Sequence, residues 1–207
     1  MIKITFMGAG STVFLRNVLG DCIYTDALKG MEIALYDIDG QRLEQSAAIL
    51  EAINKGNGCP ASIRSYLGAE NRRKALSGAD FVINAIQVGG YDPCTITDFE
   101  IPKKYGLRQT IGDTLGIGGI MRALRTIPVL EDFARDMEAV CPNAWFLNYT
   151  NPMSMLTGYM LRYTGVKTLG LCHSVQTCSK TLMDAIGMSD RLEGRRELIA
   201  GINHMGW

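Results

Sequence analysis

The sequence contains little histidine and carries no net charge. Only two of its 207 residues are histidines, and 21 lysine and arginine residues balance 21 aspartate and glutamate residues. A neutral chain offers no electrostatic reason to bind nucleic acid or an acidic surface. No apolar run approaches the roughly 20 residues of a membrane span, and the first residues lead into a strand rather than a signal peptide. We therefore expect neither a nucleic-acid partner nor a membrane partner.

The six cysteines are scattered along the chain, and no secretory signal precedes them. This pattern is typical of a reduced, cytoplasmic protein rather than of a disulfide framework. Five of the cysteines are expected to be small, buried hydrophobic side chains. The sixth, Cys172, is different because it lies beside His173, and the second histidine, His204, follows 32 positions after the cysteine.

Short apolar segments alternate with amphipathic ones along the chain. Strands are expected at residues 2–7, 32–36, 63–66, 80–88, 144–149 and 167–171, with helices between most of them. Such alternation is typical of an α/β fold with a doubly wound, mainly parallel sheet of the Rossmann type. We expect residues 1–170 to form an NAD-binding domain and residues 171–207 to begin an α+β catalytic domain. Residues 203–207 lack a cap or a polar tail, so we expect a fragment of a longer protein.

The first predicted strand ends in a glycine-rich turn at residues 8–13. Glycines between a strand and a helix let backbone N–H groups at the helix N-terminus face a pyrophosphate. Val13 replaces the third glycine of the usual fingerprint, which weakens the match. Asp37 ends the second strand, where an acid binds the ribose hydroxyls and disfavours a 2′-phosphate. The alternative is an ordinary turn and an ordinary strand-end acid. The pattern predicts an NAD site that includes Gly8, Gly10, Ser11, Thr12 and Asp37.

Two further polar side chains follow predicted strands. Gln87 lies near the end of the fourth strand, where the chain runs along a bound cofactor toward its nicotinamide. The fifth strand leads into residues 148–152, whose Asn-Pro pair resembles that of lactate and malate dehydrogenases. In those enzymes the asparagine lies near nicotinamide and substrate, so Asn151 is a candidate substrate contact. A helix cap or a turn before proline is the other interpretation.

A thiolate and an imidazole are available beside the predicted redox site. Cys172 falls at the carboxyl end of the sixth strand, the edge at which open α/β sheets bind ligands. His204 follows a further predicted strand at 198–203. A cysteine and a histidine suit a transition metal, with water and substrate oxygens as additional ligands. On these two residues alone, a buried cysteine and a structural histidine are the favoured interpretation.

The whole chain resembles the N-terminal half of a glycoside hydrolase of family 4, in its α-galactosidase branch. The matching segments occur in family order, at residues 4–12, 89–94, 113–120, 148–152, 170–174 and 201–204. The resemblance implies tightly bound NAD and a divalent metal, usually Mn²⁺, held by Cys172 and His204, with Asn151 contacting the sugar. Relatives that cleave phosphorylated sugars carry an arginine just after the Gly-Gly pair. Residues 91–94 contain none, so an unphosphorylated sugar is expected.

The resemblance also implies a mechanism without a pair of catalytic carboxylates. NAD takes hydride from C3 of the sugar, a base removes the C2 proton, and the metal stabilises the enediolate. The aglycone is eliminated, water adds, and the hydride returns. His173 holds the position of a general acid that is an aspartate in phospho-α-glucosidases, and Asp113 matches an acid that supports a tyrosine base in the C-terminal half. Alternatives are a supporting or solvated role for His173 and a helix cap for Asp113.

Several other functions share part of this pattern. An α-galacturonidase, an α-glucuronidase or a phospho-glycosidase of the same family would keep most of the motifs. A lactate- or malate-type dehydrogenase would keep the fold, but it needs an arginine-bearing loop after the fourth strand, and residues 89–93 lack arginine. A non-catalytic NAD-binding domain is a further alternative. The resemblance also implies a homodimer or a homotetramer.

Overall fold

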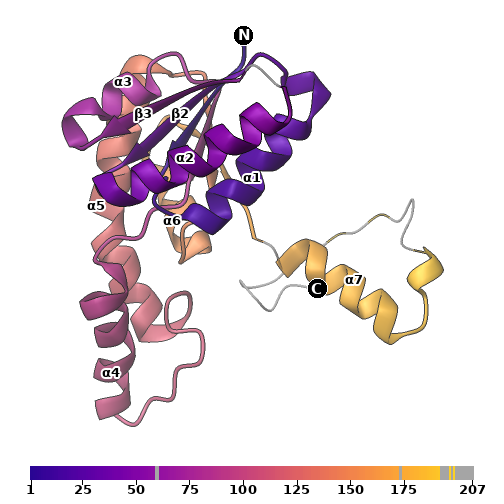
Figure 1. Cartoon of the computed structure of the whole chain (residues 1–207). Coiled ribbons are helices and arrows are strands. Elements are labelled where there is room, and N and C mark those ends of the chain that lie inside the picture. Colours follow the sequence, from indigo (N-terminus) through magenta and orange to yellow (C-terminus); the bar gives the residue numbers. More distant parts are fainter. Residues whose placement is uncertain (59–60, 173, 192–195, 197, 199–207) are drawn as a thin grey trace. The chain divides into compact units, whose positions relative to one another are not determined.

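The structure is a computed structural model that describes residues 1–58, 61–172, 174–191, 196 and 198 (Figure 1). The chain divides into two compact units, Met1–Gly170 and Leu171–Trp207. The described residues of the second unit include helix α7 (Ser174–Ala185) and the short helix η4 (Ser189–Arg191). Among the residues that the structure describes, no helix is long and apolar enough to cross a membrane.

The first unit is built on a six-stranded sheet in the order β3-β2-β1-β4-β5-β6, in which every neighbouring pair is parallel. Its strands are β1 (Lys3–Met7), β2 (Glu32–Asp37), β3 (Ser62–Leu67), β4 (Phe81–Asn84), β5 (Trp145–Asn148) and β6 (Lys167–Gly170). This order confirms the predicted doubly wound Rossmann fold. Because the strand order reverses between β1 and β4, the carboxyl ends of these two strands flank the crevice in which such sheets bind ligands.

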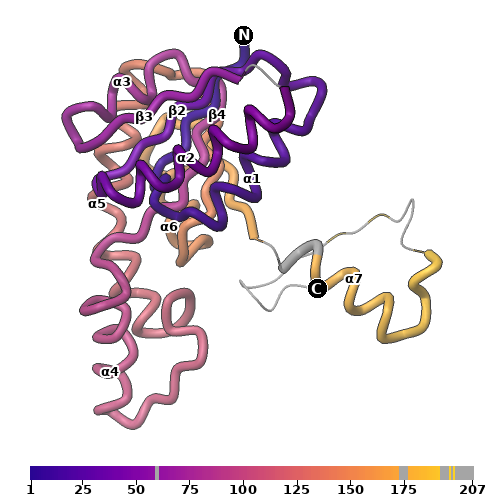
Figure 2. The backbone as a smooth tube through the Cα atoms, viewed as in Figure 1, coloured from indigo at the N-terminus to yellow at the C-terminus, as the bar shows by residue number. Residues whose placement is uncertain are grey.

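Helices cover both faces of the sheet (Figures 1 and 2). One face carries α1 (Thr12–Tyr24) and α2 (Gly40–Gly56), and the other carries α3 (Arg72–Leu76), α5 (Gly116–Val140) and α6 (Met153–Tyr163). Phe6 and Met7 are both fully buried, but they belong to different apolar clusters. Successive strand residues point to opposite faces, so β1 supplies both cores. Each such burial stabilises the fold by about 1.5–3 kcal/mol.

The predicted fourth strand, 80–88, is wrong at its carboxyl end. Strand β4 ends at Asn84, and residues 85–88 leave the sheet. Ala85 N–H still donates to the Met7 carbonyl, but Gly8 turns the neighbouring chain away, so pairing cannot continue. Helix α1 ends at Tyr24, and a separate 3-10 helix, η1 (Asp26–Leu28), follows it.

The prediction of buried cysteines holds, among the residues described, only for Cys141. Cys22, Cys94 and Cys178 are half-buried, and Cys59 lies outside the described residues. Cys22 packs at the margin of the α1–α2 cluster rather than inside it. Burial raises the pKa of Cys141 to about 11, so its thiol is protonated at neutral pH.

Candidate active site at the carboxyl edge of the sheet

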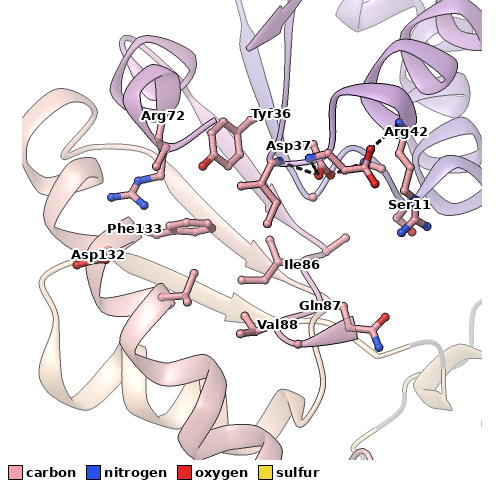
Figure 3. Close-up of a pocket in the computed structure, with 18 residues that line it drawn as sticks. Ser11, Tyr36, Asp37, Arg42, Arg72, Ile86, Gln87, Val88, Asp132 and Phe133 are labelled. Carbon is pink, nitrogen blue, oxygen red and sulfur yellow. Dashed lines mark hydrogen bonds between the residues drawn. The ribbon is translucent and has the colours of Figure 1, made fainter. Parts of the chain in front are cut away.

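A cavity of about 540 Å³ lies at the carboxyl ends of β1, β2 and β4 (Figure 3). Its walls come from the glycine-rich turn, the end of β2 with the start of α2, the segment after β4, and the middle of α5. Five of the predicted cofactor residues line it: Gly8, Gly10, Ser11, Asp37 and Gln87. Thr12 is not one of the lining residues, and its hydroxyl lies 3.0 Å from the hydroxyl of Ser46 on α2.

Gly8 brings the turn into contact with the backbone that follows β4. Its φ is +88°, in the left-handed region that favours glycine. A Cβ at this position would lie 2.7 Å from the carbonyl oxygen of Ala85 and 2.9 Å from the nitrogen of Ile86. Only glycine therefore allows the turn and the segment after β4 to form adjacent walls of one cavity.

The Asp37 carboxylate is held at the rim by three backbone donors. Its Oδ2 accepts from Gly10 N–H at 2.5 Å. Its Oδ1 accepts from Ile38 N–H at 2.8 Å and from Asp39 N–H at 2.9 Å. A carboxylate has about four acceptor sites, so one remains on Oδ2 for a hydroxyl donor. A fixed carboxylate with one acceptor to spare fits a ribose diol and repels a phosphate.

The N-terminus of α1 opens toward the same cavity. In the described part of the chain, the Ser11 side chain makes no capping hydrogen bond to this helix, and the first turn contains no acidic residue. The positive end of the helix dipole is therefore available for an anion. Val13, which stands where a third glycine was expected, has 66% of its surface exposed. The Val13 side chain points to solvent, so no close packing of α1 against the sheet requires a glycine at this position.

The far wall of the cavity is apolar and aromatic. Ile86, Val88 and Phe133 line it from the segment after β4 and from α5 (Figure 3). The Tyr36 and Phe133 rings meet edge to face with centroids 6.2 Å apart, and the Arg72 guanidinium lies 5.1 Å above the Phe133 ring. This wall suits a flat aromatic base. Sequence reasoning missed it, because residues about 50 positions apart approach only through the fold.

Buried amides join the ends of β4 and β5. Asn84 Nδ2 donates to Asn148 Oδ1 at 2.9 Å and to Thr150 Oγ1 at 3.1 Å. Thr150 Oγ1 in turn donates to the Ile86 carbonyl at 3.1 Å. All three polar side chains are at least 96% buried. The network ties the segment after β4 to the residues that lead into Asn151.

The structure brings three predicted residues around an arginine that sequence reasoning missed, Arg122 on α5. Arg122 Nε donates to the Asn151 carbonyl at 3.2 Å, and its Nη1 lies 4.0 Å from Asp113 Oδ2. Gln87 and Arg122 both contact Thr95 Oγ1, at 3.3 and 3.5 Å. The available signal was helical periodicity, since position 122 falls on the buried face of α5.

The capping roles weighed for Asn151 and Asp113 do not occur. The residue that caps α6 is Pro152, and the one that caps α5 is Leu115. The Asp113 side chain instead accepts from the Thr114 hydroxyl at 3.1 Å and remains 36% exposed. Both predicted residues therefore have polar atoms that helix capping does not use.

The predicted metal site falls mostly outside the part of the chain that the structure describes. Cys172 follows β6 by two residues and is half-buried. His173 and His204 lie outside the described residues, so their roles as acid and metal ligand stay predictions. Within the described ranges, no group of three or more histidine, cysteine, aspartate or glutamate side chains could hold a metal ion.

Comparison with known proteins identifies the family of the chain. The model of the family 4 glycosyl hydrolases matches residues 3–188. An α-galactosidase of Bacillus subtilis (strain 168) is 63% identical over 207 residues, which are 100% of this chain and 47% of that protein. An α-galacturonidase of the same organism is 35% identical over 212 residues, covering 100% of this chain and 46% of that protein.

Solved structures share the fold along the chain. The lplD protein of Bacillus subtilis is 33% identical with a TM-score of 0.85, covering 100% of this chain and 47% of that one. A 6-phospho-α-glucosidase from gut microorganisms, solved with NAD and Mn²⁺, has a TM-score of 0.84 at 20% identity, over 100% of this chain and 46% of that one. This chain spans about half the length of the curated relatives it matches. It belongs to family 4 of the glycosyl hydrolases.

Proposed function

We propose that the whole protein containing this chain is an NAD- and divalent-metal-dependent glycosidase that hydrolyses α-galactosides. The observation that carries the proposal is the cavity in which the glycine turn and Asp37 are joined by the 2.5 Å hydrogen bond. A dinucleotide site in a member of a hydrolase family indicates a cofactor that is used and regenerated within each cycle. The 63% identity to an α-galactosidase supports this choice of sugar.

The proposed NAD contacts come from four parts of the chain. The N-terminus of α1 would take the pyrophosphate, and Asp37 would accept from the ribose hydroxyls. The apolar wall formed by Ile86, Val88 and Phe133 would hold the adenine. Gln87 would lie on the way to the nicotinamide, beside Thr95 and Arg122. Bound NAD supplies a hydride acceptor and donor at the carboxyl edge of the sheet.

We further propose that Cys172 and His204 hold the divalent metal. The donor set supports a transition ion, because a thiolate and an imidazole favour such ions over Mg²⁺ or Ca²⁺. The choice of Mn²⁺ among these ions rests on the family resemblance. Cys172 also follows the carboxyl end of β6, the edge at which this sheet class binds ligands. The bound ion supplies a Lewis acid for sugar oxygens.

The remaining residues would orient the sugar and move its protons. Asn151 would contact the sugar, and the Asp113 carboxylate would support the base that removes the C2 proton. The His173 imidazole would protonate the departing aglycone, since an imidazole can donate a proton near neutral pH. The proposed order is oxidation at C3, proton loss at C2, elimination, addition of water, and reduction at C3. The net reaction is hydrolysis, so no external oxidant is consumed.

An unphosphorylated substrate is proposed from the segment after Gly90. Residues 91–94 are Tyr-Asp-Pro-Cys and bring no cation to pair with a 6-phosphate. Tyr91 has 70% of its surface exposed within the described unit. We also propose a cytoplasmic enzyme that works as a homodimer or homotetramer.

The test is an assay of the whole protein on p-nitrophenyl α-galactoside, with and without NAD, Mn²⁺ and a thiol reductant. We expect turnover to require both cofactors and to be lost in Cys172→Ser. In D₂O the product should gain deuterium at C2. The corresponding α-galacturonide is assayed in parallel. If the enzyme prefers the galacturonide, the proposed sugar is a galacturonic acid rather than a galactose. Full activity in EDTA, after bound NAD has been stripped, would overturn the proposal.

A further inference from the structure

Helix α5 directs two arginines, three residues apart, at the segments that surround the proposed sugar site. Arg125 is paired with a carboxylate. Its two Nη atoms donate to the Asp98 carboxylate at 3.2 and 2.6 Å, and its Nε donates to the Val88 carbonyl at 3.1 Å. Asp98 lies on α4 (Ile96–Lys104) and is 1% exposed. A bidentate, buried pair of this kind fixes the position of α4 and of the segment after β4.

Arg122 is more enclosed than Arg125, whose side chain is 25% exposed, and it is paired differently. Its side chain is 11% exposed. Among the described residues it makes one ordinary hydrogen bond, to the Asn151 carbonyl at 3.2 Å, and a longer contact of 3.5 Å to Thr95 Oγ1. The nearest carboxylate, that of Asp113, lies 4.0 Å away. Burial lowers the pKa of Arg122. The negative charge of Asp113 raises this pKa, and the positive charge of Arg125 lowers it further.

The three contacts of Arg122 come from three separate segments. Asn151 follows β5, Thr95 ends the π-helical turn η3 (Gly90–Thr95), and Asp113 precedes α5. One guanidinium is therefore the common neighbour of the segments that carry the proposed sugar contact and the proposed support of the base. A contact of 4.0 Å keeps Asp113 within the field of the cation. Its Oδ1 accepts from the Thr114 hydroxyl, and its Oδ2 can accept from a further donor.

We propose that Arg122 is a positioning residue for the reaction, which holds the Asn151 backbone and the Asp113 carboxylate at fixed places beside the sugar. This inference rests on the proposed function. A purely structural arginine would resemble Arg125, whose carboxylate partner is buried and accepts from both of its Nη atoms. Arg122 instead faces a carboxylate that is 36% exposed, and it acts on the chemistry through that group.

The experiment compares variants of the whole protein on p-nitrophenyl α-galactoside. Arg122→Met should lower kcat by about 10²-fold, the loss associated with misplacing a reacting group by about 1 Å. NAD affinity should stay within about twofold, because Arg122 does not line the cofactor cavity. Arg122→Lys restores the charge but not the planar fork, so it should recover part of the lost kcat. Arg135→Met, on the same helix with a 64% exposed side chain, is the matched control and should retain wild-type kcat.

A double-mutant cycle with Asp113→Asn separates positioning from general loss of structure. If Arg122 acts through Asp113, Arg122→Met should cost far less kcat in the Asp113→Asn background than in the wild type. The inference would be overturned if Arg122→Met lowers kcat by the same factor in the Asp113→Asn variant as in the wild type. It would also be overturned if Arg122→Met alone has wild-type kcat. If Arg122→Met does not fold, Arg122→Lys is decisive, and wild-type kcat for it would also overturn the inference. A wild type without cofactor-dependent glycosidase activity would refute the proposed function instead.

Discussion

Replacing Gly8 by alanine tests the close approach on which the cofactor cavity depends. The new methyl group would lie 2.7 Å from the Ala85 carbonyl oxygen and 2.9 Å from the Ile86 nitrogen, and both atoms belong to backbone that cannot simply rotate away. The residue would also keep a φ of +88°. A left-handed conformation costs an L-residue about 1–2 kcal/mol. Overpacking costs about 1–3 kcal/mol more.

We therefore expect Gly8→Ala to lower the free energy of unfolding by about 2–5 kcal/mol. Relief of the clash would move residues 85–88, which line the cavity, so NAD affinity should fall by roughly tenfold or more. Urea denaturation followed by circular dichroism measures the first quantity, and fluorescence titration with NAD measures the second.

Gly30→Ala is the matched control for this substitution. Gly30 has a φ of +80°, but a Cβ there would meet no atom within 4 Å among the described residues. It should therefore cost only the conformational part, about 1–2 kcal/mol, and leave NAD affinity unchanged. Equal effects of the two substitutions on stability and on NAD affinity would refute the view that close backbone approach is what requires glycine at position 8.

Three further outcomes are expected. Asp37→Ser should lower NAD affinity and raise the NADP-to-NAD affinity ratio, measured by parallel titrations, because a fixed negative charge is removed. Burial raises the pKa of Asp136, but hydrogen bonds from Arg73 and Arg72 outweigh this and lower it below its usual value. Asp136 thus stabilises the fold above about pH 4, its pKa when unfolded, and loses this contribution as pH falls through the folded pKa. The urea midpoint of unfolding should therefore fall less on acidification in Asp136→Asn than in the wild type. Native Cys141 should stay unalkylated by iodoacetamide at pH 8, by mass spectrometry, since its pKa is about 11.

The cofactor half of the site could be predicted because its determinants are local. A strand, a glycine turn and a helix follow one another directly at the start of the chain, and Asp37 ends the next strand. Parallel strands bring their carboxyl ends to one edge, so these residues had to meet once the alternation was recognised. Asn151 was singled out in the same way, as a polar residue shortly after a strand, and its contact with the sugar stays a prediction.

The other half of the site depends on contacts between distant segments. Arg122 meets the Asn151 carbonyl 29 positions away, and Arg72 lies above the ring of Phe133, 61 positions further along the chain. Helical periodicity predicts which face of α5 packs against the sheet. It does not predict which position on that face, such as 122, contacts a loop rather than the core. The end of β4 was misjudged for a related reason. Residues 85–88 are apolar enough for a strand, but the strands on both sides, β1 and β5, end opposite Asn84.

By itself, the sequence determined the parallel α/β fold, the family, and the residues of the turn and of Asp37, because these follow from hydrophobic periodicity and from motifs read along the chain. Only the tertiary structure decided that Asp37 is held by the Gly10 amide, that α5 and the segment after β4 form the apolar wall of the cavity, and that Arg122 lies among three segments. The physical reason is that a buried polar contact depends on which groups the fold brings within about 3 Å, and sequence spacing does not contain that distance.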